Sequence, residues 1–189
     1  AALSRARRPF LEVEVSHKGL GQGDDVFQRL NTGIPAPTSP EYADFTAFSW
    51  IAHFAEVHVE PSTCRVRVPR VVSVCDCGRV LNHRTASNQV RGGVVWAFGA
   101  ALREIGEVDP RFNRIVNNDL ADYVLPVNAD IGDIDVELLD IADTNLNISG
   151  AKGIGEVAMV GATAAIVNAV YHATGRRIRH LPIRIEDLL

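Results

Sequence analysis

The stretch that decides the fold is Gly150-Ala151-Lys152-Gly153-Ile154-Gly155-Glu156. A mostly apolar run follows directly after it, up to Val170. Three glycines this close together let another group approach the backbone, because glycine has no Cβ atom. The run 157–170 is apolar almost all round, which predicts a buried helix. A glycine-rich loop that leads into a helix offers free backbone N–H groups to an anion or a polar cofactor. We therefore predict a binding loop in front of a buried helix.

Glu156 stands where this predicted helix begins, and therefore inside the predicted site. The helix dipole favours the ionised carboxylate, whereas burial opposes ionisation. A carboxylate held between these two effects is a candidate general base. A structural interpretation is equally open on spacing alone, because acidic residues are favoured in the first turn of any helix. The loop is not a Walker loop, since no Ser or Thr follows the lysine, and its glycine spacing differs from GxGxxG.

The same stretch resembles the G-x-K-G-x-G-E signature of the molybdenum hydroxylases, the xanthine dehydrogenase and aldehyde oxidase family. Other segments resemble family motifs in the family's order: His53-Phe54-Ala55-Glu56-Val57, Asp76-Cys77-Gly78-Arg79 with Leu81-Asn82, Gln89-Val90-Arg91-Gly92-Gly93, and the tail from Ala173 to Ile183. The resemblance covers residue 45 to the C-terminus, and the chain looks most like the large subunit of bacterial aldehyde oxidoreductases.

The resemblance implies a hydroxylase that oxidises aldehydes or aromatic heterocycles and takes the oxygen atom from water. It implies molybdenum with a molybdopterin dinucleotide, in the cytosine form, and no side chain that ligates the metal. Glu156 would be the catalytic base. The cofactor-binding residues would be Lys152, Gly153, Ile154 and Gly155 on the pterin side, and Asn82, Thr85, Ala86 and Gln89 on the dinucleotide side. Asn88 stands where many members have glycine, which puts the local backbone path in doubt.

Large subunits of this family are several times longer than this chain. The resemblance therefore implies the C-terminal part of such a subunit, which shares its site with an N-terminal half. Iron–sulfur and FAD subunits or domains and a small aldehyde or heterocycle would be further partners. The alternative is a non-catalytic interaction module that keeps the fold and has lost the chemistry.

Composition bounds the partners and the compartment. The net charge of −4 argues against nucleic acid, which needs a basic face. No apolar run is expected to be long enough and charge-free enough to span a membrane, and no secretory signal is visible at the N-terminus. An odd number of cysteines, Cys64, Cys75 and Cys77, suggests reduced thiols with structural roles. These features favour the cytoplasm, with the periplasm as the alternative if the chain is exported with a partner.

The order of predicted elements indicates an α+β chain with mixed strands and two main helices. Residues 1–44 are predicted to be an N-terminal segment with a Gly/Pro-rich linker over 16–44, and residues 45–189 the molybdopterin-binding domain. A hairpin is expected over 47–76, where β-branched residues flank a Pro-Ser turn. The apolar stripe Val90, Val94, Phe98 and Leu102 predicts a helix from Asn82 to about Glu104.

Gly92 and Gly93 lie inside that helix, where each glycine costs about 1 kcal/mol relative to alanine. Close approach of a cofactor and close contact with a second helix both explain such a pair.

Three more strands are expected, over 120–126, 131–141 and 178–185. In the second of them the acidic residues form a solvated face rather than a calcium site, because the EF-hand spacing is absent. Gly175 should end the second main helix, and a helical turn should follow at 185–189.

Overall fold

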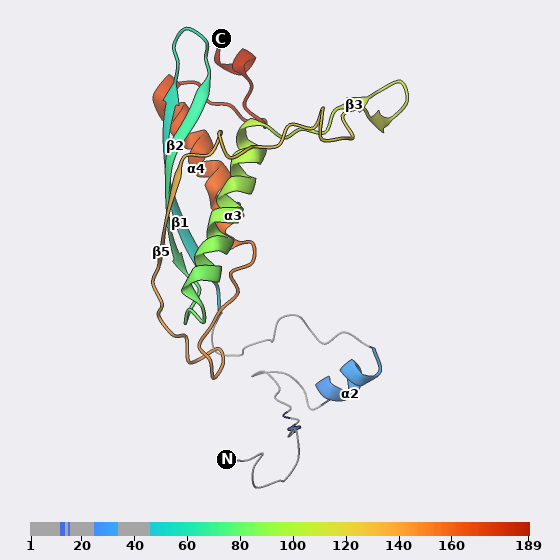
Figure 1. Ribbon diagram of the computed structural model, residues 1–189, viewed down its shortest axis with the longest axis vertical. Coiled ribbons are helices and arrows are strands. Elements are labelled where there is room, and N and C mark those ends of the chain that lie inside the picture. The colour runs from blue at the N-terminus through green and yellow to red at the C-terminus, as the bar shows by residue number, and fades with distance from the viewer. Residues whose placement is uncertain (1–11, 14, 16–24, 34–45) are drawn as a thin grey trace. The chain divides into compact units, whose positions relative to one another are not determined.

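The computed structural model describes residues 12–13, 15, 25–33 and 46–189 (Figure 1). The chain divides into two compact units, Ala1–Thr46 and Ala47–Leu189. In the first unit the described residues include a short helix, α2 (Val26–Asn31). This helix interrupts the segment predicted as a linker, and the rest of that segment lies outside the described residues. The assignment of 1–44 and 45–189 as linker and cofactor domain stays a prediction.

The second unit is built on a three-stranded sheet with the order β1-β2-β5. Strands β1 (Trp50–Val59) and β2 (Val66–Asp76) form the predicted antiparallel hairpin. Strand β5 (Asp133–Leu138) lies parallel to β2 on its other side. The prediction of a half-buried strand here is confirmed, because its acidic residues alternate to the exposed face.

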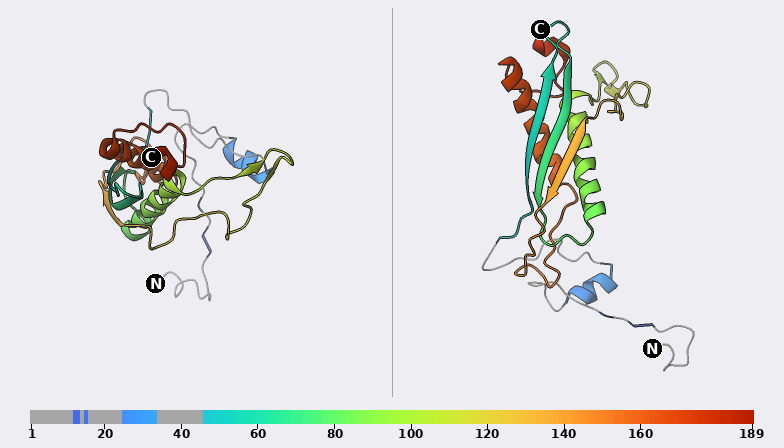
Figure 2. Two further views of the ribbon diagram at one scale, coloured as in Figure 1. Left: turned by 90° about the horizontal axis from the view of Figure 1, so that it is seen from above. Right: turned by 60° about the vertical axis from the view of Figure 1, so that its left-hand side comes forward.

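Helices α3 (His83–Leu102) and α4 (Val157–Thr174) pack side by side on one face of this sheet (Figures 1 and 2). Both were predicted, and the α+β class with two main helices is confirmed. Gly175 ends α4 in the left-handed conformation, with φ 72°. The core lies between sheet and helices, and its buried residues are Val68, Val71, Val94, Ala97, Phe98, Ala101, Ala162 and Ile166.

Helix α4 is less buried than its composition suggests. Its buried residues repeat every four positions, at Ala158, Ala162, Ile166 and Val170. Val160 lies outside this stripe and is 75% exposed. The prediction of a helix buried all round is therefore wrong, since only one side contacts the sheet and α3. No membrane-spanning run was expected, but by length and composition alone α4 is apolar enough to cross a membrane. The core helix of a globular domain passes the same test, and α4 has the buried stripe of such a helix.

The two glycines inside α3 have different surroundings. A Cβ atom on Gly93 would lie 2.6 Å from the Cβ of Ala158 and 3.1 Å from the backbone nitrogen of Met159, both in α4. A Cβ atom on Gly92 would meet nothing within 4 Å. Helix–helix contact therefore explains Gly93, and no contact among the described residues explains Gly92.

Two predicted strands do not form. Residues 120–122 form a turn and 124–126 are irregular. The strand pairing nearby is the short hairpin of β3 (Val108–Asp109) and β4 (Arg114–Ile115). Residues 178–185 pair with no strand in the described part of the chain. Instead the Ile183 N–H donates to the carbonyl of Ala101 at the end of α3. The helical turn that follows, η1 (Ile185–Leu188), was predicted.

The cysteines of β2 and of the segment after it are structural in this fold. Cys75 and Cys77 are buried, as expected for two residues on one face of a strand. Burial raises the pKa of the Cys75 thiol to about 12, so this thiol stays protonated at neutral pH. Burial also raises the pKa of Cys77.

Candidate functional site

The glycine loop 150–156 lies against the segment that follows β2. An isolated β-bridge joins Gly78 to Ala151. Next to it the Lys152 N–H donates to the carbonyl of Cys77 at 2.8 Å. Two motifs that are far apart in the sequence therefore form one backbone unit, and this unit fixes where the loop leaves the sheet.

This contact requires glycine at two positions. Gly78 and Gly150 both have φ of +70°, a conformation that side chains disfavour. A Cβ atom on Gly78 would lie 2.3 Å from the carbonyl oxygen of Gly150. That same oxygen accepts hydrogen bonds from the backbone N–H groups of Arg79, at 2.8 Å, and Asp143, at 2.9 Å. Glycine at 78 and 150 is thus explained by the fold of the chain itself.

A nearly buried ion pair links the loop to the end of β2. The Lys152 Nζ lies 3.0 Å from Asp76 Oδ2, and the lysine side chain is only 8% exposed. Asp76 Oδ1 accepts the N–H of Gly78 at 3.0 Å. This hydrogen bond, with help from Lys152, lowers the pKa of Asp76 despite its partial burial. The Lys152 side chain is therefore held toward Asp76, and its ammonium keeps further N–H donors for another partner.

Asn147 shapes the turn before the loop and was missed at the sequence level. Its Oδ1 accepts the N–H of Gly150 at 2.8 Å, and its Nδ2 donates to the carbonyl of Ala151 at 2.9 Å. An asparagine three residues before a glycine of positive φ is a typical turn-forming arrangement. That pattern was the signal that could have found it.

The start of α3 lies beside the loop. Asn82 caps the helix, since its Oδ1 accepts the N–H groups of Arg84 at 3.0 Å and Thr85 at 3.1 Å. Thr85 Oγ1 in turn donates to the carbonyl of Asn82 at 3.3 Å. Ala86 is half-buried in the first turns. Asn82 and Thr85 therefore have a structural role that the motif alone did not indicate.

Gln89 connects this helix to the loop. Its Nε2 donates to the carbonyl of Gly155 at 2.6 Å. One N–H and the amide oxygen of Gln89 remain available for another group. The helix continues without a break through Asn88, so the departure from the family pattern at this position leaves the backbone regular.

Gly153 and Gly155 differ from the glycines above. Both are exposed, neither has a positive φ, and a Cβ atom on either would meet nothing within 4 Å. Nothing in the described part of the chain therefore requires glycine here. Between them, Ile154 packs against the buried cluster of Cys75 and Cys77, and Ser49 Oγ donates to the carbonyl of Gly153. The loop is thus anchored at Ile154 and open at the glycines on either side.

Glu156 occupies the N-cap of α4, with φ −122°. Its side chain is exposed and makes no hydrogen bond to another described residue. The expected opposition between burial and the helix dipole is therefore wrong for this chain, because the carboxylate is not buried. It lies one residue after the open glycine Gly155, next to the free N–H groups of the helix start.

No group of three His, Cys, Asp or Glu side chains within the described ranges could hold a metal ion. The groups that the loop and the start of α3 offer to a ligand are the open glycine pair, the amide of Gln89 and backbone N–H groups at the start of α4.

A family model described as the molybdopterin cofactor-binding domain matches residues 16–132. The chain therefore belongs to this family, in molybdenum hydroxylases of the aldehyde oxidoreductase and xanthine dehydrogenase type.

Among its relatives is the aldehyde oxidoreductase molybdenum-binding subunit PaoC of Escherichia coli, 46% identical over 151 residues that cover 80% of this chain and 20% of PaoC. The putative xanthine dehydrogenase molybdenum-binding subunit XdhA of Escherichia coli is 33% identical over 71% of this chain and 18% of its own length.

A solved structure, the aldehyde oxidoreductase of Desulfovibrio desulfuricans, superposes with a TM-score of 0.68 and 26% identity, covering 86% of this chain and 19% of that one. The chain thus spans about a fifth of the length of the curated relatives it matches.

Proposed function

We propose that this chain is the C-terminal portion of a molybdenum hydroxylase subunit that oxidises aldehydes or aromatic heterocycles with water as the oxygen source. Loop 150–156 and the start of α3 would together hold a molybdopterin dinucleotide. The observation that carries the proposal is the pair Gly153 and Gly155, which no contact or φ value within the described chain requires. These open glycines stand beside the amide of Gln89 and the start of α4, where a group from outside the chain could approach the backbone closely.

The loop residues would have separate tasks. Backbone groups at 153–155 would contact the pterin, and Lys152 would add positive charge from its position beside Asp76. The remaining N–H and oxygen of Gln89 suit the edge of a cytosine base, which supports the cytosine form of the dinucleotide. Asn82, Thr85 and Ala86 would support this side through the capped start of α3.

The bound cofactor would supply the redox centre. Glu156 would act as the general base that takes a proton from the water-derived nucleophile at its carboxylate oxygens. Its exposed position at the N-cap supports this role, because the carboxylate is not committed to a hydrogen bond in the described chain. The electrons would pass to iron–sulfur and FAD partners.

Molybdenum analysis tests the proposal. The chain would be produced alone and together with the N-terminal part of a molybdenum-binding subunit such as those of its relatives. The molybdenum content per chain would be measured in both preparations. We expect close to one molybdenum in the complex and much less in the isolated chain, because binding sites usually bury most of their ligand. Stoichiometric metal in the isolated chain would contradict the shared site, and a complex without metal would contradict cofactor binding.

A matched pair of variants locates the cofactor. Gly155→Val in the complex should lower the molybdenum content, since the added side chain would stand where the cofactor approaches. Gly106→Val is the control, because Gly106 is also exposed, has no positive φ, and a Cβ atom on it would likewise meet nothing within 4 Å. Equal molybdenum content in the two variants would remove the loop from the binding site.

A further inference from the structure

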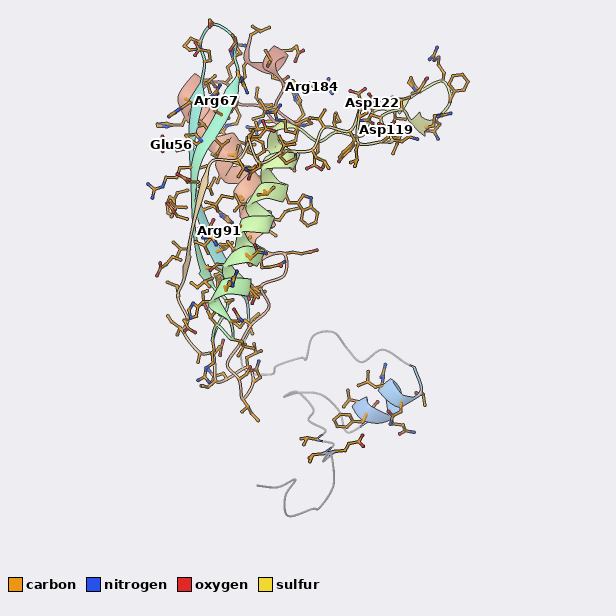
Figure 3. The ribbon with its side chains drawn as sticks, in the orientation of Figure 1. Glu56, Arg67, Arg91, Asp119, Asp122 and Arg184 are labelled. Carbon is orange, nitrogen blue, oxygen red and sulfur yellow. The ribbon has the colours of Figure 1, made fainter. Side chains whose placement is uncertain are left out.

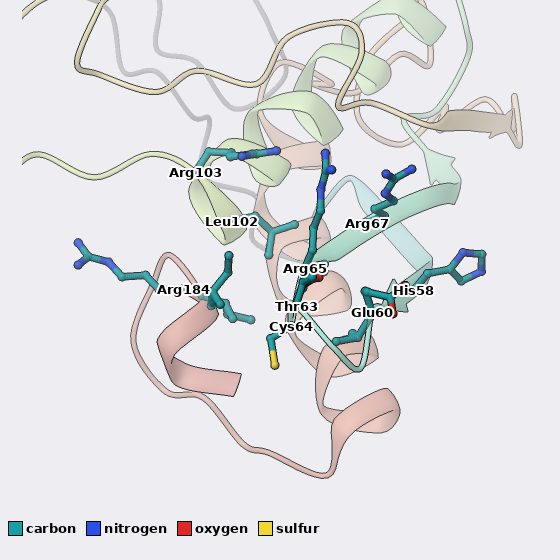
Figure 4. A pocket seen from close by; sticks show the side chains of 13 residues that line it. His58, Glu60, Thr63, Cys64, Arg65, Arg67, Leu102, Arg103 and Arg184 are labelled. Atoms are coloured by element: carbon teal, nitrogen blue, oxygen red, sulfur yellow. The ribbon is translucent and has the colours of Figure 1, made fainter. Parts of the chain in front are cut away.

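A pocket lies at the other end of the sheet from the glycine loop. It has a volume of about 720 Å³ and opens between the β1–β2 hairpin, the end of α3 and the segment 183–185 (Figure 4). Ser49 at the start of β1 touches the glycine loop, whereas His58 and Val59 at its end line this pocket. A ten-residue strand spans about 33 Å, so the two sites are separate.

The lining of the pocket combines apolar and basic residues. The apolar lining residues are Val59, Val66, Leu102 and Ile183. The basic lining residues are Arg65, Arg67, Arg103 and Arg184, and Figure 3 places Arg67 and Arg184 at this hairpin end of the unit. This combination suits a ligand with an apolar body and a negatively charged head.

Three of the arginines extend toward the same end of the pocket. Figure 4 shows the guanidinium groups of Arg103, Arg65 and Arg67 on one side, whereas Arg184 extends in the opposite direction. Arg65 and Arg67 flank Val66, so both start from the face of the chain opposite Val66, and their long side chains line the pocket from there. Guanidinium groups gathered at one end of a pocket favour an anionic ligand.

The charges at this end of the pocket are only partly balanced within the described residues. Arg103 donates to Asp130 Oδ1 at 2.7 Å, so its charge has a partner. The side chains of Arg65 and Arg67 make no ion pair or hydrogen bond with any residue that the structure describes. Glu60 is the acidic residue among those that line the pocket. It lies near the hairpin turn, where its carboxylate accepts a hydrogen bond from the hydroxyl of Ser62. Two unpaired guanidinium groups match the charge of a phosphate monoester.

We propose that this pocket binds an organic phosphate, with the phosphate between Arg65, Arg67 and Arg103 and the apolar body against Leu102 and Ile183. One guanidinium group can donate two parallel hydrogen bonds to two phosphate oxygens. A pocket of this volume can hold a small organic molecule. The site is separate from the cofactor loop, and its ligand is bound rather than transformed.

Binding is tested with phenyl phosphate as the probe, by calorimetry and by backbone NMR of the whole chain. We expect saturable binding with shifts confined to 58–67, 102–103 and 183–185. Benzoate has the same ring with one charge, and inorganic phosphate has the headgroup without the ring, so both should bind more weakly. Shifts elsewhere, or no saturable binding, would overturn the proposal.

Two arginine variants and a control complete the test. Arg65→Ser and Arg67→Ser should each weaken phenyl phosphate binding about tenfold, as expected for one charge-assisted contact. Arg111→Ser should leave binding unchanged, because Arg111 pairs with Asp109 in the β3–β4 hairpin, away from the pocket. Unchanged binding in both pocket variants would overturn the site.

One further ligand distinguishes a free phosphate from a protein segment. The peptide acetyl-Asp-Asp-Phe-amide carries comparable charge and an apolar ring on a polypeptide backbone. Weaker binding of this peptide than of phenyl phosphate supports the proposal. Tighter binding of the peptide would overturn it in favour of a docking site for an acidic polypeptide. Both measurements are independent of molybdenum, so they succeed or fail separately from the cofactor proposal.

Discussion

Glu156 is the residue on which the proposed chemistry depends. In the cofactor-loaded complex, Glu156→Gln should lower turnover by about 10²–10⁴-fold, because glutamine keeps the size but cannot accept the proton. Molybdenum content and folding should stay close to those of the wild type. The measurement is steady-state oxidation of an aromatic aldehyde, normalised to molybdenum.

Glu186→Gln is the matched control, since Glu186 lies in the first turn of η1 and is also exposed. Its replacement should leave turnover unchanged. If Glu156 only complements the helix dipole, its glutamine variant will keep more than about a tenth of the rate, which is too much for a lost general base.

His53 gives the stability of the fold a pH dependence. Its Nδ1 lies 2.8 Å from the hydroxyl of Ser73, which is fully buried between sheet and helix. Burial lowers the pKa of His53 below the ordinary value of 6.5, although the backbone of Ala158 acts in the opposite direction. The unfolded chain therefore binds a proton at a higher pH than the folded chain does. The free energy of unfolding should fall as pH drops below about 6.5, and this loss should stop below the lowered pKa.

Urea unfolding between pH 7.5 and 5 measures this effect. His53→Gln should flatten the slope in this range, because glutamine does not titrate. The lowered pKa values of Asp76 and Asp187 act in a separate window, where stability is lost only as pH falls from about 4 downward. An equal slope in wild type and variant would exclude His53 as the cause.

At the level of secondary-structure elements, Gly92 and Gly93 predict opposite responses to one substitution. Gly93→Ala should destabilise the fold by about 1–3 kcal/mol, because its Cβ would overlap with Ala158 of α4. Gly92→Ala should stabilise it by up to about 1 kcal/mol, since alanine is the better helix former and nothing lies within 4 Å. Chemical unfolding of both variants is the measurement. Equal effects would show that α3 and α4 are not in close contact at this point.

Elements with a strong local pattern could be predicted from the sequence. The β1–β2 hairpin and α3 have clear periodicity, and their packing agrees with it. The segment 178–185 contains three isoleucines, but no strand in the described part of the chain pairs with it, and the Ile183 N–H donates to the carbonyl of Ala101 at the end of α3 instead. In α4 the buried side could not be predicted from composition, because apolar residues occur on all sides of the helix and no polar face marks the exposed side. Local pattern specifies an element only when tertiary contacts agree with it.

The site could be predicted in part at the scale of the whole molecule. The motif resemblance brought Gln89 and the loop into one site, and their hydrogen bond agrees with that grouping. The pair of Lys152 and Asp76 could not be read from the sequence, because the two residues are far apart and the backbone contacts around Gly78 bring them together. The arginine pocket was missed for the same reason, since its sides come from three distant segments.

Large apolar side chains remain exposed over the second unit of the molecule. Among the described residues Trp50 is 65% exposed, Phe54 64% and Trp96 50%. Exposed aromatic residues of this size often mark contact surfaces. Their exposure supports the proposal that this chain functions as one part of a larger subunit.

The parallel pairing of β5 with β2 has a consequence for the order of folding. The β1–β2 hairpin closes a short turn, whereas β5 can join β2 only after α3 and the segment 103–132 have been brought back to the sheet. Closing that long connection costs chain entropy before any contact compensates for it. Strand β5 should therefore be the last strand to form and the first to open. In native-state hydrogen exchange, the β5 amides bonded to β2 should exchange faster than the β2 amides bonded to β1, and the reverse order would place the nucleus of folding at β5.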